Sequence, residues 1–456
     1  MNGLFGTDGV RGLANVELTP ELAMALARAA AAAIAPQGSR PRFLVGKDTR
    51  ASGDMLESAV AAGLSSMGVD VALAGVIPTP AAAYLIRELL LDGGVMVSAS
   101  HNPFQYNGLK FLGPGGEKLS EQEEARIEEL LVGELPCGEA GIAGRTSREQ
   151  GLCDHYADGV RRIARTRLEG MRVVVDCAHG ALWEVAPRVL NEMGAKVLAL
   201  NCCPDGTNIN QGGAVQPQGM AAAVRERGAD AGLAFDGDGD RVVLADERGE
   251  LLDGDQVLAI WAGHLHARGE LANDTVVGTV ITNGGLERYL SSLGCHLVRT
   301  AVGDRYVADE MRRRGAALGG ETCGHIIVSR HLPSADALFV GATALGIAAR
   351  TRRPLSALAG LMDKRPQANL DVPVARGTDW RSNATVREAV REAELSLRDG
   401  GWLVVRASGT EPVIRVTAES EEAKEAARVV RQVAGLIEDR MGARRELRDV
   451  EPARAV

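Results

Sequence analysis

Aromatic residues are scarce in this sequence: phenylalanine, tyrosine and tryptophan together make up 3% of its 456 residues. Proteins that bind single-stranded nucleic acid commonly stack bases on aromatic rings, and nucleic-acid-binding proteins in general attract the phosphates with basic residues. The formal net charge of this chain is −9, so the second feature is missing as well. We therefore expect no nucleic-acid partner, although a local cluster of arginine and lysine can still bind a small anion.

Cysteine and long apolar runs are also limited. The seven cysteines form no CxxC pair, and their odd number argues against a disulfide framework. The first residues, MNGL, do not resemble a signal peptide, and the apolar stretch at residues 22–35 is interrupted by Arg28 and too short to cross a bilayer. We interpret that stretch as a buried, alanine-rich helix, and we expect a cytoplasmic protein with no membrane partner.

The chain is too long for one hydrophobic core, and three of its segments repeat one plan. Each has a β-branched strand, a helix ending at glycine, a second strand, and a third strand that leads into a polar loop. This plan is typical of doubly wound α/β layers, in which ligands bind outside the carboxyl ends of the strands, so we expect the three loops to share one cleft. The three units begin with residues 42–50, 171–180 and 274–285, and their third strands and loops are residues 93–103, 232–241 and 316–325.

The last part of the chain follows a different plan. Strands are predicted at residues 369–375, 402–412 and 413–419, and helices at 382–397 and 421–439, which together indicate an α+β domain. The residues after this domain are charged and lack periodicity, which is typical of a flexible tail. The predicted boundaries are 1–154, 155–253, 254–365 and 366–445 for the four domains, and 446–456 for the tail.

The loop at residues 236–241, DGDGDR, carries the clearest chemical signal. Glycines between Asp236, Asp238 and Asp240 let a tight backbone direct three hard oxygen donors at one cation. An EF-hand is the rival interpretation, but Arg241 stands where that loop needs glycine, and the VVLAD that follows predicts a strand. Three carboxylates without a complete cage leave room for a phosphate oxygen, which suits Mg²⁺.

The loop at residues 98–111, SASHNPFQYNGLKF, places Ser100 at the end of a predicted buried strand. A serine hydroxyl becomes a good nucleophile only when a base or a cation assists it, and His101 and Lys110 are close in sequence. Asn-Pro and Asn-Gly pairs are also common in ordinary turns, so this loop alone leaves both interpretations open.

Three further groups of residues combine glycine with polar or basic side chains. Residues 319–325, GGETCGH, offer the mixed donors and acceptors that sugar hydroxyls need, although an ordinary strand-to-loop turn explains them equally well. Residues 406–412, RASGTEP, surround a glycine with a guanidinium and two hydroxyls, which suits a phosphate dianion. Glycine-rich segments nearer the N-terminus add Arg11, Lys47 and Arg50.

In this order, the segments resemble those of the α-D-phosphohexomutase superfamily and, within it, its bacterial phosphoglucosamine mutase branch. The resemblance covers nearly the whole chain and implies an α/β fold: three related doubly wound α/β domains and a C-terminal α+β phosphate-binding domain around a central cleft. It implies an isomerase that interconverts glucosamine 6-phosphate and glucosamine 1-phosphate, feeding UDP-N-acetylglucosamine and cell-wall synthesis. The matching segments are GTDGVRG, GKDTRASG, SASHNP with NGLK, DGDGDR, VGDRYV, GGExxGH and RASGTEPVIRV.

The resemblance also implies a role for each motif. Ser100 would be a phosphoserine that gives its phosphate to the sugar, forms a hexosamine 1,6-bisphosphate intermediate, and receives the other phosphate back. One Mg²⁺ would bind to Asp236, Asp238, Asp240 and Ser100, and the enzyme would be a monomer or homodimer acting on a small sugar phosphate. The implied catalytic residues are Ser100, His101, Lys110, Arg241, His325 and Arg11. The implied substrate-binding residues are Lys47, Arg50, Glu321, Thr322, Cys323, Arg406, Ser408, Gly409, Thr410 and Arg415.

Three departures from the family pattern concern the sugar and not the phosphoryl transfer. Cys323 stands where the family usually has serine, and residues 329–339 retain Asp336 but lack the usual GDG. Tyr106 stands where the glucosamine branch commonly has aspartate, and tyrosine is more usual in phosphomannomutases and phosphoglucomutases. A mutase for mannose or glucose phosphates is therefore the alternative. A non-catalytic sugar-phosphate-binding paralogue would need a damaged transfer loop, yet Ser100 and the three aspartates are present.

Overall fold

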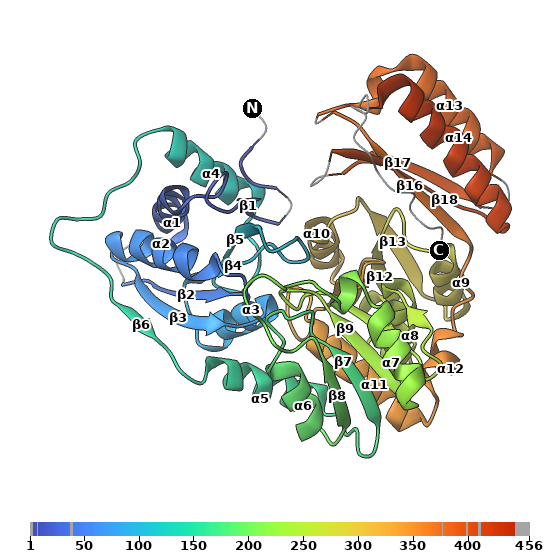
Figure 1. Ribbon diagram of the computed structural model, residues 1–456, viewed down its shortest axis with the longest axis horizontal. Coiled ribbons are helices and arrows are strands. Elements are labelled where there is room, and N and C mark those ends of the chain that lie inside the picture. Colours follow the sequence, from blue (N-terminus) through green and yellow to red (C-terminus); the bar gives the residue numbers. More distant parts are fainter. Residues whose placement is uncertain are drawn as a thin grey trace. The chain divides into compact units, whose positions relative to one another are not determined.

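The computed structural model of the protein describes most of the chain, and Figure 1 shows its helices and strands. The described residues form two compact units: residues up to 282 together with 286–362, and residues 283–285 together with those from 363 onward. The described ranges are residues 3–6, 8–36, 40–375, 377–397, 400–408 and 412–442.

The larger unit begins with a six-stranded α/β layer. Its elements are β1 (Val10–Leu13), α1 (Pro20–Ile34), β2 (Arg42–Lys47), α2 (Gly53–Ser66), β3 (Asp70–Val76), α3 (Thr79–Glu88), β4 (Gly93–Val97), β5 (Tyr106–Leu112), α4 (Glu121–Val132) and β6 (Thr146–Arg148). The strand order is β1-β5-β4-β2-β3-β6. Strands β4, β2, β3 and β6 are parallel, whereas β5 is antiparallel to both β4 and β1.

A second layer follows, with the strand order β11-β10-β9-β7-β8. Its elements are α5 (Leu152–Ala164), β7 (Arg172–Asp176), α6 (Val185–Glu192), β8 (Lys196–Leu200), the 3-10 helix η1 (Gly213–Val215), α7 (Gln218–Arg227), β9 (Ala231–Phe235), β10 (Val242–Ala245) and β11 (Leu251–Leu252).

The third layer has the strand order β13-β12-β14-β15. Its elements are α8 (Gly254–Ala267), the 3-10 helix η2 (Ala272–Asp274), β12 (Thr275–Thr279), α9 (Gly284–Ser292), β13 (His296–Thr300), α10 (Asp304–Arg314), β14 (Leu318–Gly320), β15 (Ile326–Val328), α11 (Ala337–Thr351) and α12 (Leu355–Ala359).

The three layers share one strand order, which confirms the predicted threefold repeat. Each contains three parallel strands in the order second, first, third, and a fourth strand that returns antiparallel to the third. The polar loop of each repeat is the turn between the third and fourth strands. The first repeat was predicted without its fourth strand, so Lys110 lies on β5 and not on a loop. Arg11, predicted on a glycine-rich loop, lies on β1 because Arg11 pairs with Gly108 of β5.

One hydrophobic cluster continues through all three layers, from Leu44 to Met362. The ring of Tyr156 on α5 meets Tyr84 on α3 edge-on at 6.0 Å, and its hydroxyl donates a 2.9 Å hydrogen bond to Asp336 Oδ1, the N-cap residue of α11. This shared core packs the three layers into one body.

The alanine-rich segment at residues 22–35 forms the buried helix α1, as predicted. It packs against α2 at Gly63, where a Cβ atom would lie 2.5 Å from the carbonyl oxygen of Met24. None of the helices in the described ranges combines the length and hydropathy needed to span a membrane.

The smaller unit is the predicted α+β domain. Its elements are β16 (Gln367–Pro373), the 3-10 helix η3 (Trp380–Ser382), α13 (Ala384–Ser396), β17 (Trp402–Ala407), β18 (Val413–Glu419) and α14 (Ala423–Met441). The strands are antiparallel in the order β16-β18-β17, and α13 and α14 contribute to a separate hydrophobic core. The strand predicted at residues 402–412 ends at Ala407, and the tail predicted at 446–456 lies outside the described residues.

Replacing Tyr156 by phenylalanine should destabilise the larger unit. The change keeps the ring but removes a buried hydrogen bond to Asp336, so we expect the free energy of unfolding to fall by about 1–3 kcal/mol. Urea unfolding followed by circular dichroism measures the difference. Tyr306→Phe, at a position that is 41% exposed, is the matched control and should leave stability nearly unchanged; equal stabilities in both variants would contradict this account of the core.

Candidate active site

Two of the three polar loops meet directly inside the larger unit. Ser100 lies in the turn between β4 and β5, and Asp236 follows β9 in the equivalent turn of the second layer. The Ser100 hydroxyl donates a 2.8 Å hydrogen bond to Asp236 Oδ2, and both residues are fully buried. The structure therefore brings together two residues that are 136 positions apart and were predicted to share one site.

The serine turn adopts an uncommon backbone conformation. Ser100 has a φ angle of 50°, in the left-handed region, which persists only when the surroundings hold it there. The hydroxyl of Ser98 accepts a 2.9 Å hydrogen bond from the Ser100 amide and donates a 2.7 Å bond to the buried carboxylate of Asp48. Asn210 from the second layer donates to the carbonyl oxygens of Ser100 and Asn102 at 2.9 and 3.0 Å. The turn is thus held from both layers.

Arg50 is buried, and its guanidinium binds the backbone of the same turn. It donates to Asp48 at 2.9 Å and to four backbone carbonyl oxygens between residues 100 and 106 at 2.5 to 2.9 Å. Lys47 is also buried, with its ammonium group 2.5 Å from Asp54 and 2.6 Å from Glu57. These bonds favour a positioning role for both side chains, and their predicted contact with substrate stays a prediction.

The aspartate turn is held just as closely. Asp236 Oδ1 accepts 3.1 Å hydrogen bonds from the amides of Gly239 and Arg241. Thr79, at the start of α3, donates its hydroxyl to Asp238 Oδ2 and its amide, at 2.8 Å, to the Asp238 carbonyl oxygen. The first turn of a helix in the first layer therefore fixes a carboxylate of the second layer.

The three aspartates fit a hard divalent cation. Asp236, Asp238 and Asp240 each offer a carboxylate oxygen, and these oxygens all lie within 4.8 Å of one another. Asp238 Oδ1 and Asp240 Oδ1 are buried, and neither has a hydrogen-bond partner among the described residues. Burial, together with the charges of Asp240 and Asp238, raises the pKa of Asp236 well above its usual range. A bound cation would satisfy the two oxygens and remove the repulsion between the carboxylates.

Lys110 and His101 lie beside this cluster, the first as a cation and the second as a neutral imidazole. The Lys110 ammonium lies 2.7 Å from Asp238, 2.9 Å from Asp8 and 3.6 Å from Asp240. Burial acts against its charge, but these carboxylates outweigh burial and raise the pKa of Lys110, which stays cationic. Burial and the nearby guanidinium of Arg241 lower the pKa of His101 to about 3, so its imidazole is neutral, with Nδ1 3.4 Å from the Ser100 hydroxyl oxygen.

The third loop joins the second through its backbone. Arg241 and His325 form a β-bridge, and the Val242 amide donates a 3.2 Å hydrogen bond to the Gly324 carbonyl oxygen. Buried Glu321 accepts a 3.0 Å hydrogen bond from the Gly303 amide. The second loop therefore contacts both the first and the third loop of the repeat.

The predicted sugar-binding side chains of the third loop differ in what they contact. The Thr322 hydroxyl donates a 3.0 Å hydrogen bond to Asp255, whereas Cys323 is exposed. The imidazole of His325 is buried, with Nε2 3.6 Å from Asp304 Oδ2. A cavity of about 830 Å³, whose lining includes His325 and Asp304, adjoins this loop, and its volume is that of a small-molecule site.

Sequence reasoning missed several residues of the site. Asp8 pairs with Arg11, Lys110 and Lys118, and Lys118 also pairs with Asp304. Asp8 and Asp304 lie inside the quoted motifs GTDGVRG and VGDRYV, so those motifs were the available signal. Nothing local in the sequence marks Thr79 or Asn210, because their role depends only on contacts between layers.

Two of the predicted phosphate-binding residues of the smaller unit lie on neighbouring strands. Arg406 on β17 and Arg415 on β18 are register partners, so both guanidinium groups start from one place on the sheet. The Ser408 amide donates a 2.9 Å hydrogen bond to the Val413 carbonyl oxygen, and Arg415 Nε lies 3.3 Å from Asp371. Gly409 and Thr410 lie outside the described residues.

Comparison with known proteins identifies the class of protein to which these repeated α/β layers belong. The chain belongs to the phosphoglucomutase/phosphomannomutase family, because it matches all four of that family's domain models. The matches are alpha/beta/alpha domain I over residues 2–134, domain II over 154–249, domain III over 253–365 and the C-terminal domain over 370–436.

Within this family, the chain is similar over nearly its whole length to proteins that share one name, phosphoglucosamine mutase. The chain is 45% identical over 441 residues to the phosphoglucosamine mutase of Cereibacter sphaeroides, an alignment that covers 96% of this chain and 99% of the relative. It is 47% identical over 428 residues to the phosphoglucosamine mutase of Magnetococcus marinus, covering 92% and 88%.

Solved structures share the fold at lower identity. A phosphoglucomutase/phosphomannomutase family protein from Burkholderia thailandensis has a TM-score of 0.81 at 24% identity, covering 96% of this chain and 97% of that one. The N-acetylphosphoglucosamine mutase of Aspergillus fumigatus, solved with GlcNAc-6P and magnesium, has a TM-score of 0.61 at 19% identity, covering 88% and 84%.

Gly237 lies where the aspartate turn packs closely against the serine turn. A Cβ atom there would lie 2.8 Å from the Ser100 carbonyl oxygen and 2.9 Å from Asn210 Nδ2. We expect Gly237→Ala to push the two turns apart and lower kcat about 10–100-fold, because such displacements disturb reacting groups strongly. Steady-state assays of sugar-phosphate isomerisation check this.

The matched control is Gly219→Ala on α7, where a Cβ atom would meet no atom within 4 Å. Alanine also favours a helix more than glycine does, so this variant should be as active as the parent and at least as stable. Equal kcat values for the two alanine variants would contradict the close packing of the turns.

Proposed function

We propose that this chain is a phosphoglucosamine mutase that interconverts glucosamine 6-phosphate and glucosamine 1-phosphate through a phosphoserine at Ser100. The observation that carries the proposal is the 2.8 Å hydrogen bond from the Ser100 hydroxyl to Asp236, because it sets a transferable group against a cluster of metal-binding carboxylates. The curated relatives at 45% and 47% identity support glucosamine as the sugar.

Asp236, Asp238 and Asp240 would hold one Mg²⁺, with Ser100 as a further ligand. Bound there, Mg²⁺ supplies positive charge against the oxygens of the transferring phosphate. The Aspergillus neighbour, which shares the fold, was solved with magnesium and GlcNAc-6P, which is consistent with this assignment.

The residues around Ser100 would promote phosphoryl transfer by positioning the reacting groups and by stabilising their charge. When the bond between phosphorus and the serine oxygen breaks, a new bond forms to a sugar oxygen, and the sugar hydroxyl loses its proton. Lys110, whose ammonium lies 2.7 Å from Asp238, would stabilise the negative charge of the transferring group, and it is also a candidate general acid. The neutral imidazole of His101, 3.4 Å from the serine oxygen, and the buried His325 are the candidate acceptors. Arg241 would offset the charge of the transferring group.

The opposite phosphate needs an anchor, because the 1,6-bisphosphate must return its second phosphate to the same serine. Arg406 and Arg415, paired across β17 and β18, together with Ser408, Gly409 and Thr410, would provide it. Glu321 and Thr322 would contact the sugar hydroxyls. Such an anchor would let the same sugar bind in either of two orientations.

Substrate profiling tests the proposal. Enzyme carrying phosphate on Ser100 should isomerise glucosamine phosphates with a kcat/KM at least about tenfold above that for glucose or mannose phosphates, equivalent to about 1.4 kcal/mol of transition-state stabilisation. A preference for mannose or glucose phosphate would assign the chain to the alternative mutases of the family.

Ser100→Ala is the companion variant in the same assay. It removes the phosphate acceptor and one buried hydrogen bond to Asp236, so we expect no turnover by a variant that still folds cooperatively. Appreciable turnover by this variant would refute the phosphoserine, whatever the preferred sugar.

Arg406→Ala should mainly weaken substrate binding. Losing a charge-assisted contact costs about 1.5–3 kcal/mol, so KM should rise roughly 10- to 150-fold with a smaller change in kcat. Arg391→Ala, an exposed arginine on α13 of the same unit, is the control and should leave KM unchanged. If KM is equal in both variants, Arg406 is not the anchor.

A further inference from the structure

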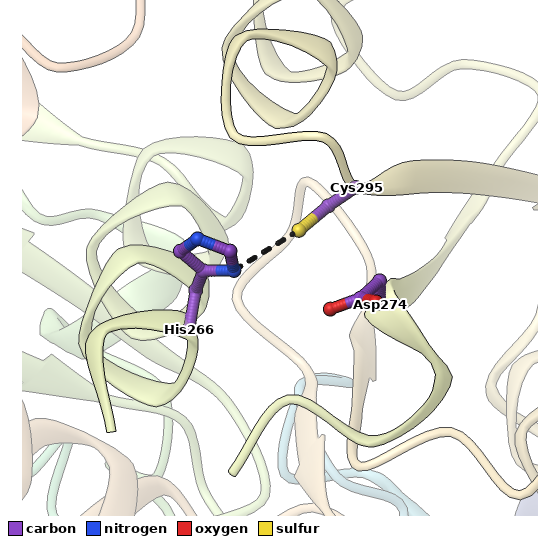
Figure 2. A group of neighbouring side chains, drawn as sticks. All are labelled: His266, Asp274 and Cys295. Atoms are coloured by element: carbon purple, nitrogen blue, oxygen red, sulfur yellow. Dashed lines mark hydrogen bonds between the residues drawn. The ribbon is translucent and has the colours of Figure 1, made fainter. Parts of the chain in front are cut away.

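A second cluster of metal-binding side chains lies in the third layer. His266, Asp274 and Cys295 each offer one ligand atom, and the three atoms lie within 4.8 Å of one another. Figure 2 shows the imidazole, the thiol and the carboxylate directed toward a common point. Apart from the aspartate triplet, this is the one such group in the part of the chain that the structure describes.

The cluster lies away from the candidate active site. His266 is in the last turn of α8, Asp274 ends η2 just before β12, and Cys295 directly precedes β13. Strands β12 and β13 are parallel with Thr275 opposite His296, so Asp274 and Cys295 are neighbours at the amino-terminal edge of the sheet. The loop with Glu321 follows a strand at the carboxyl-terminal edge. Five residues of strand separate the two edges, roughly 16 Å.

The backbone around Asp274 is fixed in an unusual shape. Asn273 and Asp274 have φ angles of 55° and 45°, both in the left-handed region. The Asn273 side chain donates a 2.8 Å hydrogen bond to the Arg314 carbonyl oxygen, and the Asp274 amide donates at 3.1 Å to Leu271. These bonds fix the backbone from which the Asp274 side chain starts.

The distances suit a tetrahedral cation. His266 Nδ1 and Cys295 Sγ are 3.4 Å apart. Bond lengths of about 2.0 Å to nitrogen and 2.3 Å to sulfur at tetrahedral angles predict a separation of about 3.5 Å between two zinc ligands. A hydrogen bond between thiol and imidazole would give a similar distance, but it does not require the carboxylate.

We propose that His266, Asp274 and Cys295 form a binding site for a zinc-like divalent cation. One nitrogen, one sulfur and one oxygen are a donor set that selects a borderline-soft metal over Mg²⁺. Cys295 is 1% exposed, His266 is half-buried and Asp274 is exposed. The thiol therefore lies in the protein interior, and the carboxylate is accessible to solvent. Solvent water would complete the fourth position. Such a cation ties the end of α8 to the starts of β12 and β13.

Cobalt titration of the full chain in excess Mg²⁺ tests this site. Mg²⁺ fills the aspartate triplet, and only a cobalt–thiolate bond gives an intense near-ultraviolet charge-transfer band. We expect one equivalent of Co²⁺ with that band, displaced by Zn²⁺. Cys295→Ser should lose the band, whereas Cys137→Ser, at an exposed cysteine in the first layer, should keep it. Because the readout is spectroscopic, it is independent of the proposed enzymatic activity.

Asp274→Asn and His266→Gln extend the test to variants that leave the buried thiol intact. Loss of one ligand should weaken Co²⁺ binding at least about tenfold in each. No band in the parent protein, a band that persists in Cys295→Ser, or unchanged affinity in both ligand variants would overturn the site.

Discussion

The structure of the candidate site depends on how buried negative charge is balanced where two layers meet. Asp236, Asp238 and Asp240 lie together at the end of a buried strand, and repulsion between three carboxylates in a low-dielectric interior is strong. Lys110 from the first layer lies 2.7 Å from Asp238 and supplies one compensating charge. The remaining negative charge favours a cation, and the layers must stay packed for the balance to hold.

The same packing determines the position of Ser100. Its left-handed backbone is an unfavourable conformation that the chain maintains through Arg50 on one side and Asn210 on the other. Gly237 allows the second layer to approach because a side chain there would collide with the Ser100 carbonyl. Hydrophobic burial shared by all three layers thus stabilises an arrangement of polar groups that none of them could hold alone.

Much of the site could be predicted from local sequence. The alternation of β-branched strands with helices, repeated three times, predicted the fold class, and the glycine-spaced aspartates predicted a metal site. Thr79 and Asn210 were not predicted, since nothing in their neighbourhood distinguishes them from capping or turn residues. Arg50 was predicted to contact substrate from the resemblance to the family, and only the tertiary structure reveals that its guanidinium also donates to Asp48 and to the serine turn.

The sequence by itself determined most of the helices and strands, the order of the loops and the chemical type of each reactive group, because these depend on residues near one another in the chain. Tertiary structure alone decided which groups meet. Ser100 and Asp236 are 136 positions apart, and His266 and Cys295 gain a shared neighbour in Asp274 only through the register of β12 and β13. Distances between such residues are set by packing of layers and strands, which no local pattern encodes.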